Sequence, residues 1–448
     1  MKKGMFFALA ASSLLFSACS SDDAVVSTVG QNEAVQQIVL QVASSGDGLT
    51  TRAGRPLYSS QALQTIQNVC VVIYKDDATK AIVKKVKKDW TESSTYDNHG
   101  RQLTLTLKGN DRLEEGNYKV MAVGYSTGSD YEYSLDVTSE NALTGTYSDI
   151  TATLKADKAA EEVFAGDAEL KIGNDKNITN LTSGEKNGVA VTLHRQVAGS
   201  FGYFQNIPAK VNGKAAATLR LVVRDKNDKL TFNNFNSSFT ANGATGSTVK
   251  YNVNGSKSPS AATADAKFYN NEDGYVLYSI NLQTWFPRLD ENGDGVLNAQ
   301  DTHWTHPADV KTQVVKGSVF GSSFVIPFNL TSGKNTMELQ LLAADGEIIK
   351  TWTVSIPTSD VNTDDSKGAT DVSASIFNVV RNHMYNLGVK TSNGTTEPGP
   401  GNPTPDPDPD KPKPEPGTDQ PEDLTKSQNL ILKVNDNWEA IHKLELGD

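Results

Sequence analysis

The residues best suited to chemistry lie in one acidic, glycine-containing stretch, DENGDGVLNAQD, between residues 290 and 301. Side chains with oxygen atoms stand at positions one, three, five, nine and twelve of this stretch, and a glycine stands at position six. In EF-hand loops this spacing directs alternate oxygens onto one hard cation, and position seven adds a backbone carbonyl. The stretch therefore predicts a structural Ca²⁺ site formed by Asp290, Asn292, Asp294, Val296, Asn298 and Asp301.

The same stretch has an alternative interpretation as a surface turn that binds no metal. Position twelve is Asp301, which is shorter than the usual Glu, and no helical pattern flanks the stretch. A bound calcium ion would stiffen a long insertion between strands. His303 and His306 follow in DTHWTH, and without a third soft ligand nearby we expect them to form a surface pair.

Catalytic patterns are not found in the sequence. It contains no nucleophile elbow, phosphate-binding loop, zinc-protease motif or paired catalytic carboxylates. His194 and His383 lie in strand-like segments, where packing or hydrogen bonding explains them. The net charge of −11 and the absence of any basic run beyond KKVKK argue against nucleic acid as a partner. We expect a protein that is not an enzyme.

The N-terminus predicts export and lipid attachment. Lys2 and Lys3 precede an apolar run that is too short to span a bilayer, as in a secretory signal. The letters LFSAC resemble a bacterial lipobox, which implies removal of residues 1–18 and acylation of Cys19. The following SSDD resembles the tag that carries lipoproteins of Bacteroidales to the outer face of the outer membrane. The alternative is an ordinary secreted protein cut near Ala18.

The rest of the chain reads as strands. The segments CVVIYK, QLTLTLKG, GNYKVMAVGY, VAVTLHR, TLRLVVRD, GYVLYSINL, SSFVIPFNL, MELQLLA and TWTVSIP alternate apolar and polar residues or are rich in β-branched and aromatic ones. Long amphipathic helices are not evident, so we predict an all-β fold with two sandwich domains. The expected boundary at TSGEKNG separates residues 53–185 from residues 186–395. Cys70 has apolar neighbours and no disulfide partner once Cys19 is acylated, so we expect it to be buried.

Two segments at opposite ends of the chain share one pattern. Residues 19–52 form a propeptide in which Ile38, Leu40 and Val42 occupy one face of a predicted strand. Residues 396–426 are a linker rich in Pro and Asp, expected to be an extended spacer, and residues 427–448 follow it as a tail. In the tail, Leu430, Leu432 and Val434 repeat the same spacing, and Trp438 adds an aromatic anchor.

This repetition predicts strand exchange between molecules. A protease specific for arginine would cut the glycine-rich loop SSGDGLTTRAGR between Arg52 and Ala53, with Arg55 as the alternative site. Loss of the first strand would open a groove that the tail of another copy fills. Three buried aliphatic side chains contribute about 5–8 kcal/mol, and about six backbone hydrogen bonds add about 3–9 kcal/mol. The alternatives are that the tail packs on its own domain or extends freely, and that Arg52 is a solvated loop residue.

Several motifs, in this order along the chain, resemble the fimbrillins, the subunits of type V pili in Bacteroidales. They are TTRAG at 50–54, EVFAGDAEL at 162–170, VTLHRQVAGSFGYF at 191–204, VVRNHMYNLGVK at 379–390 and the terminal LKVNDNW. The resemblance implies two transthyretin-like β-sandwiches, a lipidated precursor, cleavage by an arginine-specific protease, and head-to-tail polymerisation with itself and other pilus subunits. It also implies a fimbrium on the cell surface. The long proline-rich linker departs from this pattern.

Two other functions remain open at this point. The chain could be the basal anchor of the same kind of pilus, which would keep its first strand and its lipid. It could also be a monomeric surface lipoprotein that binds a glycan or another ligand, with Tyr278, Trp285 and Trp304 as stacking residues.

Overall fold

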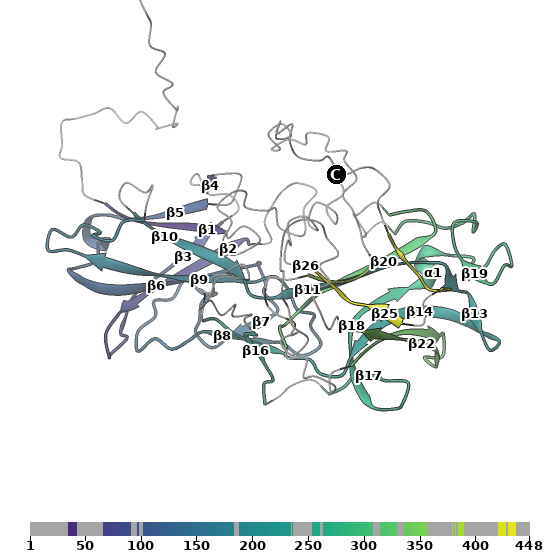
Figure 1. Ribbon diagram of the computed structural model, residues 1–448. Helices are drawn as coiled ribbons and strands as arrows, with labels where there is room; N and C mark the ends of the chain where they lie inside the picture. Colours follow the sequence, from purple (N-terminus) through teal and green to yellow (C-terminus); the bar gives the residue numbers. More distant parts are fainter. Residues whose placement is uncertain are drawn as a thin grey trace, which may run out of the picture.

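The structure is a computed structural model. It describes residues 35–42, 66–90, 96–97, 102–182, 188–233, 235, 253–259, 263–307, 314–328, 336–355, 379, 381, 384–388, 420–426 and 429–435. Their regular secondary structure consists of strands, apart from the short helix α1 (Leu282–Trp285) and a 3-10 turn at Gly109–Asp111, and turns and irregular segments connect the strands (Figure 1). The prediction of an all-β fold is confirmed.

The first part of the chain forms a sheet of eight strands that encloses its own core. Residues of β9 and β10 pair at only two positions, and the strands on either side of this junction face each other across one apolar cluster. In spatial order the strands are β3 (Ile82–Asp89), β2 (Asn68–Lys75), β6 (Gly116–Tyr125), β9 (Phe164–Ile172), β10 (Gly188–Arg195), β1 (Gln36–Val42), β5 (Gln102–Leu107) and β4 (Tyr96–Asp97).

Strand β2 packs against a separate apolar core on each of its two faces. Alternate side chains of a strand point to opposite faces. Val69, Val71 and Ile73 belong to the core inside the curled sheet, whereas Cys70 and Val72 belong to a second core outside it. Cys70 is fully buried, as predicted, and burial raises the pKa of its thiol to about 12.

The second part of the chain is built from two packed sheets with one large core between them. The first sheet has the order β20 (Ser318–Val325), β11 (Ala198–Gln205), β23 (Met384–Leu387) and β26 (Lys433–Asn435), with β24 (Glu422–Asp423) also on β11. The second has the order β17 (Ala266–Lys267), β18 (Asp273–Asn281), β14 (Lys214–Val223), β21 (Met337–Ala343), β22 (Ile348–Ser355) and β25 (Asn429–Ile431), with β13 (Lys210–Val211) beside β14.

A small sheet joins the two parts. Its order is β16 (Gly255–Ser256), β15 (Lys229–Thr231), β8 (Thr151–Leu154) and β7 (Tyr131–Tyr133), so strands from both halves of the sequence pair within it. Leu230, Phe232 and Ile326 share one apolar cluster with Val72 and Val123. Strand β10 pairs with β1 and β9, so the first sheet extends to Arg195, ten residues past the boundary expected after residue 185.

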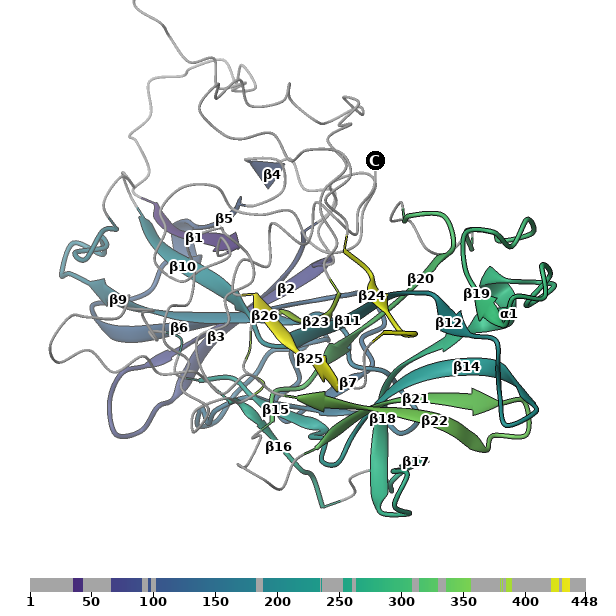
Figure 2. The same cartoon turned by 45° about the vertical axis from the view of Figure 1, so that its right-hand side comes forward.

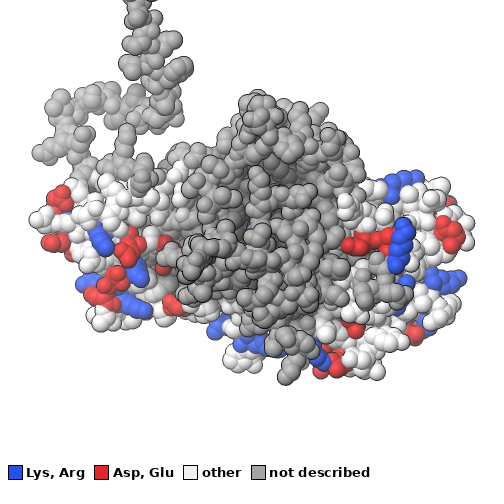
Figure 3. Space-filling view, in the orientation of Figure 1, with Lys and Arg blue, Asp and Glu red and all other residues white. Residues whose placement is uncertain are grey.

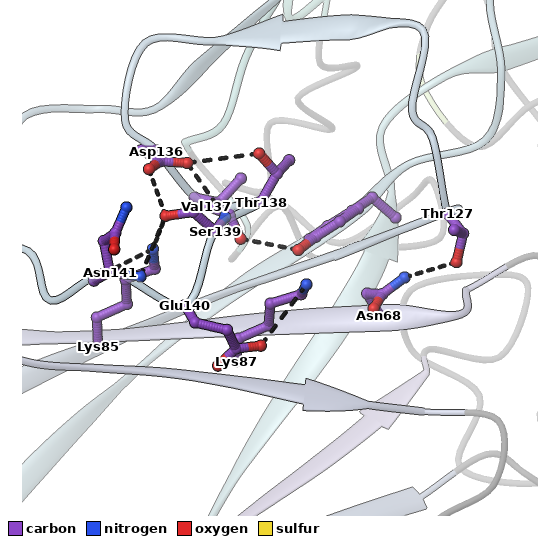
Figure 4. Close-up of polar contacts among 11 residues, drawn as sticks. Asn68, Lys85, Lys87, Thr127, Asp136, Val137, Thr138, Ser139, Glu140 and Asn141 are labelled. Carbon is purple, nitrogen blue, oxygen red and sulfur yellow. Dashed lines mark hydrogen bonds and ion pairs between the residues drawn. The ribbon is translucent and has the colours of Figure 1, made fainter.

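The surface carries charges of both signs. Lys, Arg, Asp and Glu are interspersed on the described part of the face in Figure 3. The KKVKK run lies in the edge strand β3, where Lys87 pairs with Glu140, and Lys85 donates to Ser139 and to the Asn141 carbonyl (Figure 4). Lysines on an edge strand discourage pairing with foreign strands. In the described residues we find no helix with the length and apolarity needed to cross a bilayer.

Candidate functional site

Strand β1 lies inside the first sheet and is paired along both of its edges. It runs parallel to β10 from Gln37–Gly188 to Val42–Leu193, and antiparallel to β5 from Gln36–Leu107 to Gln41–Gln102, with six residue pairs on each side. Ile38 and Leu40 are fully buried and Val42 is nearly so, all in the core of the curled sheet. Removal of β1 would therefore separate β10 from β5 and expose both strand edges and the core beneath.

The first residue of β1 is held by a polar site. Gln36 is fully buried, its Oε1 accepts from the Leu113 N–H at 2.8 Å, and its Nε2 donates to the carbonyls of Leu113 and Lys176 at 3.0 and 2.9 Å. Gln36 is not among the residues that the sequence pattern predicts for this site. The signal for it was a glutamine two residues before the first aliphatic position of the strand.

The tail lies against its own chain in this single-chain structure, so the alternative interpretation of the tail describes this state. Strand β25 pairs in parallel with β22 at three residues, and β26 pairs antiparallel with β23 at three residues. Leu430 and Leu432 are each 1% exposed in the core between the two sheets. The tail strands, yellow in Figure 2, belong to different sheets and are separated at Leu432.

The end of the expected linker is docked and is not part of a free spacer. Residues 420–426, here called the clip, lie beside β11, with Leu424 fully buried and its N–H donating to the Gln205 carbonyl at 3.1 Å. Asp423 accepts from Asn206 Nδ2 at 2.8 Å and from the backbone and hydroxyl of Thr425 at 3.0 and 2.6 Å. Lys426 completes the set at 3.0 Å.

The residue that follows β23 lies next to the first residue of the clip. Gly388 follows β23 with φ of +80°, and a Cβ at this position would stand 2.5 Å from the Tyr203 carbonyl oxygen and 3.3 Å from that of Gln420. Glycine is favoured here by both the backbone angle and the close approach. Residues 388 and 420 are thus neighbours, although 31 residues of sequence separate them.

Three of the sequence motifs meet where the two parts of the molecule join. The buried Arg195 donates to Glu162 at 2.5 Å, and its guanidinium lies 5.1 Å from the centroid of the Phe164 ring. Next to it, Gln196 Oε1 accepts from Asn254 Nδ2 at 3.0 Å and from Arg381 Nη1 at 3.5 Å. The described residues of the motifs around positions 162, 195 and 381 therefore contribute contacts at the join between the sheets.

The acidic stretch forms a compact loop. Gly295 N–H donates to both oxygens of Asp290 at 3.2 and 3.1 Å, and Gly295 has φ of +84°. Asn298 Nδ2 donates to Asp294 Oδ2 at 2.9 Å, and Asp301 accepts from the Glu291 and Asn298 N–H groups. No group of three or more His, Cys, Asp or Glu within the described residues is gathered to hold a metal. Calcium binding stays a prediction.

The residues considered as ligands of a glycan or of a transition metal make contacts within the protein. Tyr278 and Trp285 are 5% and 2% exposed and belong to the large core, and Trp304 donates its Nε1 to the Ser318 carbonyl at 2.9 Å. His303 Nδ1 lies 2.7 Å from Glu291, and the His306 ring packs against Trp285. Of the aromatic residues proposed to stack on a glycan, Tyr278 and Trp285 are buried in the core, and Trp304 is half-buried beside it.

Several predicted sites lie outside the described residues. These are the signal peptide with Cys19, the cleavage site at Arg52 and Ala53, its alternative Arg55, and Trp438. Of the predicted donor residues, Leu430 and Leu432 are placed with their side chains, and Val434 only through the pairing of β26.

Comparison with known proteins gives distant structural likenesses. No protein-family model matches the chain, and no curated protein matches it by sequence. A fimbrial assembly protein from Parabacteroides distasonis matches with 14% identity over 80% of this chain and 92% of its own, at a TM-score of 0.33. The fimbrial anchor protein from Porphyromonas gingivalis matches with 11% identity over 79% and 90%, at 0.33. The tip fimbrial protein of the same species, with a C-terminal truncation, matches with 8% identity over 79% and 94%, at 0.31.

Proposed function

We propose that this chain is a structural subunit of a cell-surface type V pilus, most simply of its shaft, and that it supports adhesion. In this proposal the precursor is exported as a lipoprotein on Cys19 and held at the outer membrane. An arginine-specific protease then cuts between Arg52 and Ala53, and copies join by donor-strand exchange. The observation that carries the proposal is β1, a seven-residue strand inserted between two others, together with a tail of the same apolar spacing.

The pairing of the two segments favours exchange energetically. In its own chain the tail has three residue pairs on one side of each short strand, at the edges of two sheets. The groove left by β1 offers six pairs on each of two sides. Each additional backbone hydrogen bond contributes about 0.5–1.5 kcal/mol net. The tail should therefore be more stable by several kcal/mol in the empty groove of a cleaved neighbour than against its own chain.

The geometry of such a contact gives a filament. Donor and acceptor are different surfaces of one molecule, so the contact is head-to-tail and does not close. A shaft subunit needs both a removable first strand and a donor tail. A basal anchor would retain its first strand and lipid, and a tip subunit would need no donor tail.

A mixing experiment tests the proposal. A donor variant with Arg52→Ala and Arg55→Ala keeps β1 and can only donate, and an acceptor variant that ends after Lys426 can only accept once the arginine-specific protease has cut it. Each alone should stay monomeric, and their mixture should give a 1:1 dimer that does not grow, measured by size exclusion with light scattering. A mixture that stays monomeric would refute donor-strand exchange, and so would cut acceptors that polymerise alone.

The substitution Leu432→Asp in the donor provides a second test. It would place an unpaired charge in the acceptor core, and such burial is strongly unfavourable. Dimer yield should fall to background. The matched control is Lys426→Ser, at an exposed position of the clip, which should retain the yield of the unmodified donor.

A further inference from the structure

The buried site around Gln36 is built from backbone atoms. Its partners are the Leu113 N–H and the carbonyls of Leu113 and Lys176, three groups that converge on one side chain. We call these three backbone groups the amide seat. Because no partner side chain is involved, the fold itself defines which chemical group fits: one that accepts a hydrogen bond and donates two.

An empty or mismatched amide seat would be unfavourable. Buried backbone N–H and C=O groups without partners lose their hydration and gain nothing in return. This applies above all to the Leu113 N–H and carbonyl, because the Lys176 carbonyl also accepts from Arg112 Nη2 at 2.5 Å. When cleavage removes β1, the seat loses its glutamine along with the strand. A replacement strand must therefore bring a carboxamide to this position, in addition to its aliphatic side chains.

The tail carries such a residue in the matching register. When Leu430, Leu432 and Val434 are aligned with Ile38, Leu40 and Val42, QNLILKV in the tail matches QQIVLQV in β1, and Gln428 aligns with Gln36. Gln428 lies outside the described residues, so the match rests on the sequence and on the described environment of Gln36.

We propose that Gln428 of one copy occupies the amide seat of its neighbour and thereby fixes the register of the donor strand. This inference rests on the proposed strand exchange. A shift by one residue would turn the aliphatic side chains away from the core, and the strand pattern alone forbids it. Shifts by two residues keep aliphatic side chains at two of the three core positions and place Gln428 at the position of Ile38 or Asp436 at that of Val42, and the amide seat is a further determinant against them.

The amide seat excludes both of these shifts. In one direction Leu430 would enter the seat and satisfy none of its three groups. In the other direction Lys426 would enter it, and an ammonium cannot accept from the Leu113 N–H. A second contact agrees with the proposed register: Gln41 Nε2 donates to Thr192 Oγ1 at 3.1 Å, and Lys433, which aligns with Gln41, also carries a donor.

Disulfide trapping measures the register directly. In β1, Gln41 faces Thr192 on β10, so the proposed register places Lys433 of the donor opposite Thr192 of the acceptor. Donors with Lys433→Cys, Ile431→Cys or Asn435→Cys report the proposed register and the two shifted ones, each mixed with a protease-cut acceptor carrying Thr192→Cys. All chains carry Cys19→Ser, and the remaining Cys70 is fully buried. The crosslink from position 433 should dominate.

The donor variant Gln428→Leu tests the role of the carboxamide. Crosslink yield at position 433 should fall at least about tenfold, since a buried backbone N–H loses its partner, or the crosslink should move to position 431 or 435. The matched control is Asn429→Leu, which aligns with the half-buried Gln37 and should crosslink as the unmodified donor does.

The same crosslinking comparison can be made with two synthetic peptides of residues 427–438 in place of the donor, each with Lys433→Cys and with Gln or Leu at position 428. Because a peptide need not fold, this form of the test does not depend on folding of the donor variant. Gln428→Leu with unchanged yield and register would overturn the inference. A dominant crosslink from position 431 or 435 in the unmodified donor would overturn it while leaving strand exchange intact. No crosslink from any unmodified donor would refute strand exchange itself, and the inference with it.

Discussion

Arg195 and Glu162 form an ion pair within the fold at the join between the two parts of the molecule. Their side chains are 8% and 1% exposed. Burial of two charges is costly, and the cost is offset only while both partners are present. Loss of one member should therefore lower the stability of the fold more than the intact pair raises it.

We predict that Glu162→Ala lowers the free energy of unfolding by about 3–5 kcal/mol, because the buried Arg195 guanidinium loses the carboxylate to which it donates. Denaturant unfolding followed by tryptophan fluorescence measures the change. Glu132→Ala is the matched control, since Glu132 is an exposed glutamate in β7 and should change stability little. Equal effects of the two substitutions would contradict the prediction.

Asp423 gives the clip a dependence on pH. Partial burial by itself raises the pKa of Asp423, but hydrogen bonds from Thr425, Lys426 and Asn206 outweigh it and hold the pKa at about 2. Because the folded pKa is depressed, the contribution of this carboxylate to stability is fully present above the unfolded value near 3.8 and is lost as the pH falls through about 2.

The melting temperature of Asp423→Asn should accordingly lie below that of the unmodified chain at pH 6, and the difference should shrink between pH 4 and pH 2. Thermal unfolding of both proteins across this range measures it. A difference that is constant down to pH 2 would show that the carboxylate charge does not hold the clip.

Among the elements, the loop of residues 290–301 is where a cation would act. Its Asp and Asn side chains already turn inward onto backbone N–H groups and onto one another, and Leu297 anchors it in the core. If a calcium ion binds, its contacts with the carboxylates would replace weaker hydrogen bonds between the polar side chains of the loop.

We predict that millimolar Ca²⁺ raises the melting temperature and that a chelator reverses the rise. The double substitution Asp290→Asn and Asp294→Asn should abolish the response, because it removes two charged ligands. Asp273→Asn, at an exposed aspartate paired with Lys267, should keep it. A melting temperature that is independent of Ca²⁺ would assign the loop to the metal-free alternative.

Strands with a strong local apolar pattern could be predicted from sequence, and strands defined by distant partners could not. GNYKVMAVGY and MELQLLA match β6 and β21 residue for residue, because each is a short apolar run of the kind that a sheet buries on both faces. Strand β15 has three residues and no local pattern, and it forms because β8 and β16 lie on either side of it. The same holds for the candidate site: Ile38, Leu40 and Val42 were predicted, but the amide seat is made by backbone from distant turns.

For the whole molecule, the shared sheet has a thermodynamic consequence. Because β15 pairs with β8, and residues of both halves fill one cluster, neither half is complete without the other. Two independent sandwiches would unfold in two steps, whereas this arrangement couples them.

Calorimetry of the precursor should therefore show one cooperative transition, with a van't Hoff enthalpy equal to the calorimetric one. Leu230→Asp should destabilise both parts together, since Leu230 is fully buried in the shared cluster. Lys229→Asp, at the adjacent half-buried position, is the matched control. Two resolved transitions would show that the halves unfold separately.

The neighbouring positions of Gly388 and Gln420 make the intervening segment a natural place for insertions. Both ends are fixed by their own contacts, so adding or deleting sequence between them costs only loop-closure entropy, which rises slowly with length. An epitope tag, an enzyme or a capture peptide inserted there would leave β23 and the clip unchanged. If copies assemble as proposed, each subunit of the filament would display one inserted tag, enzyme or peptide.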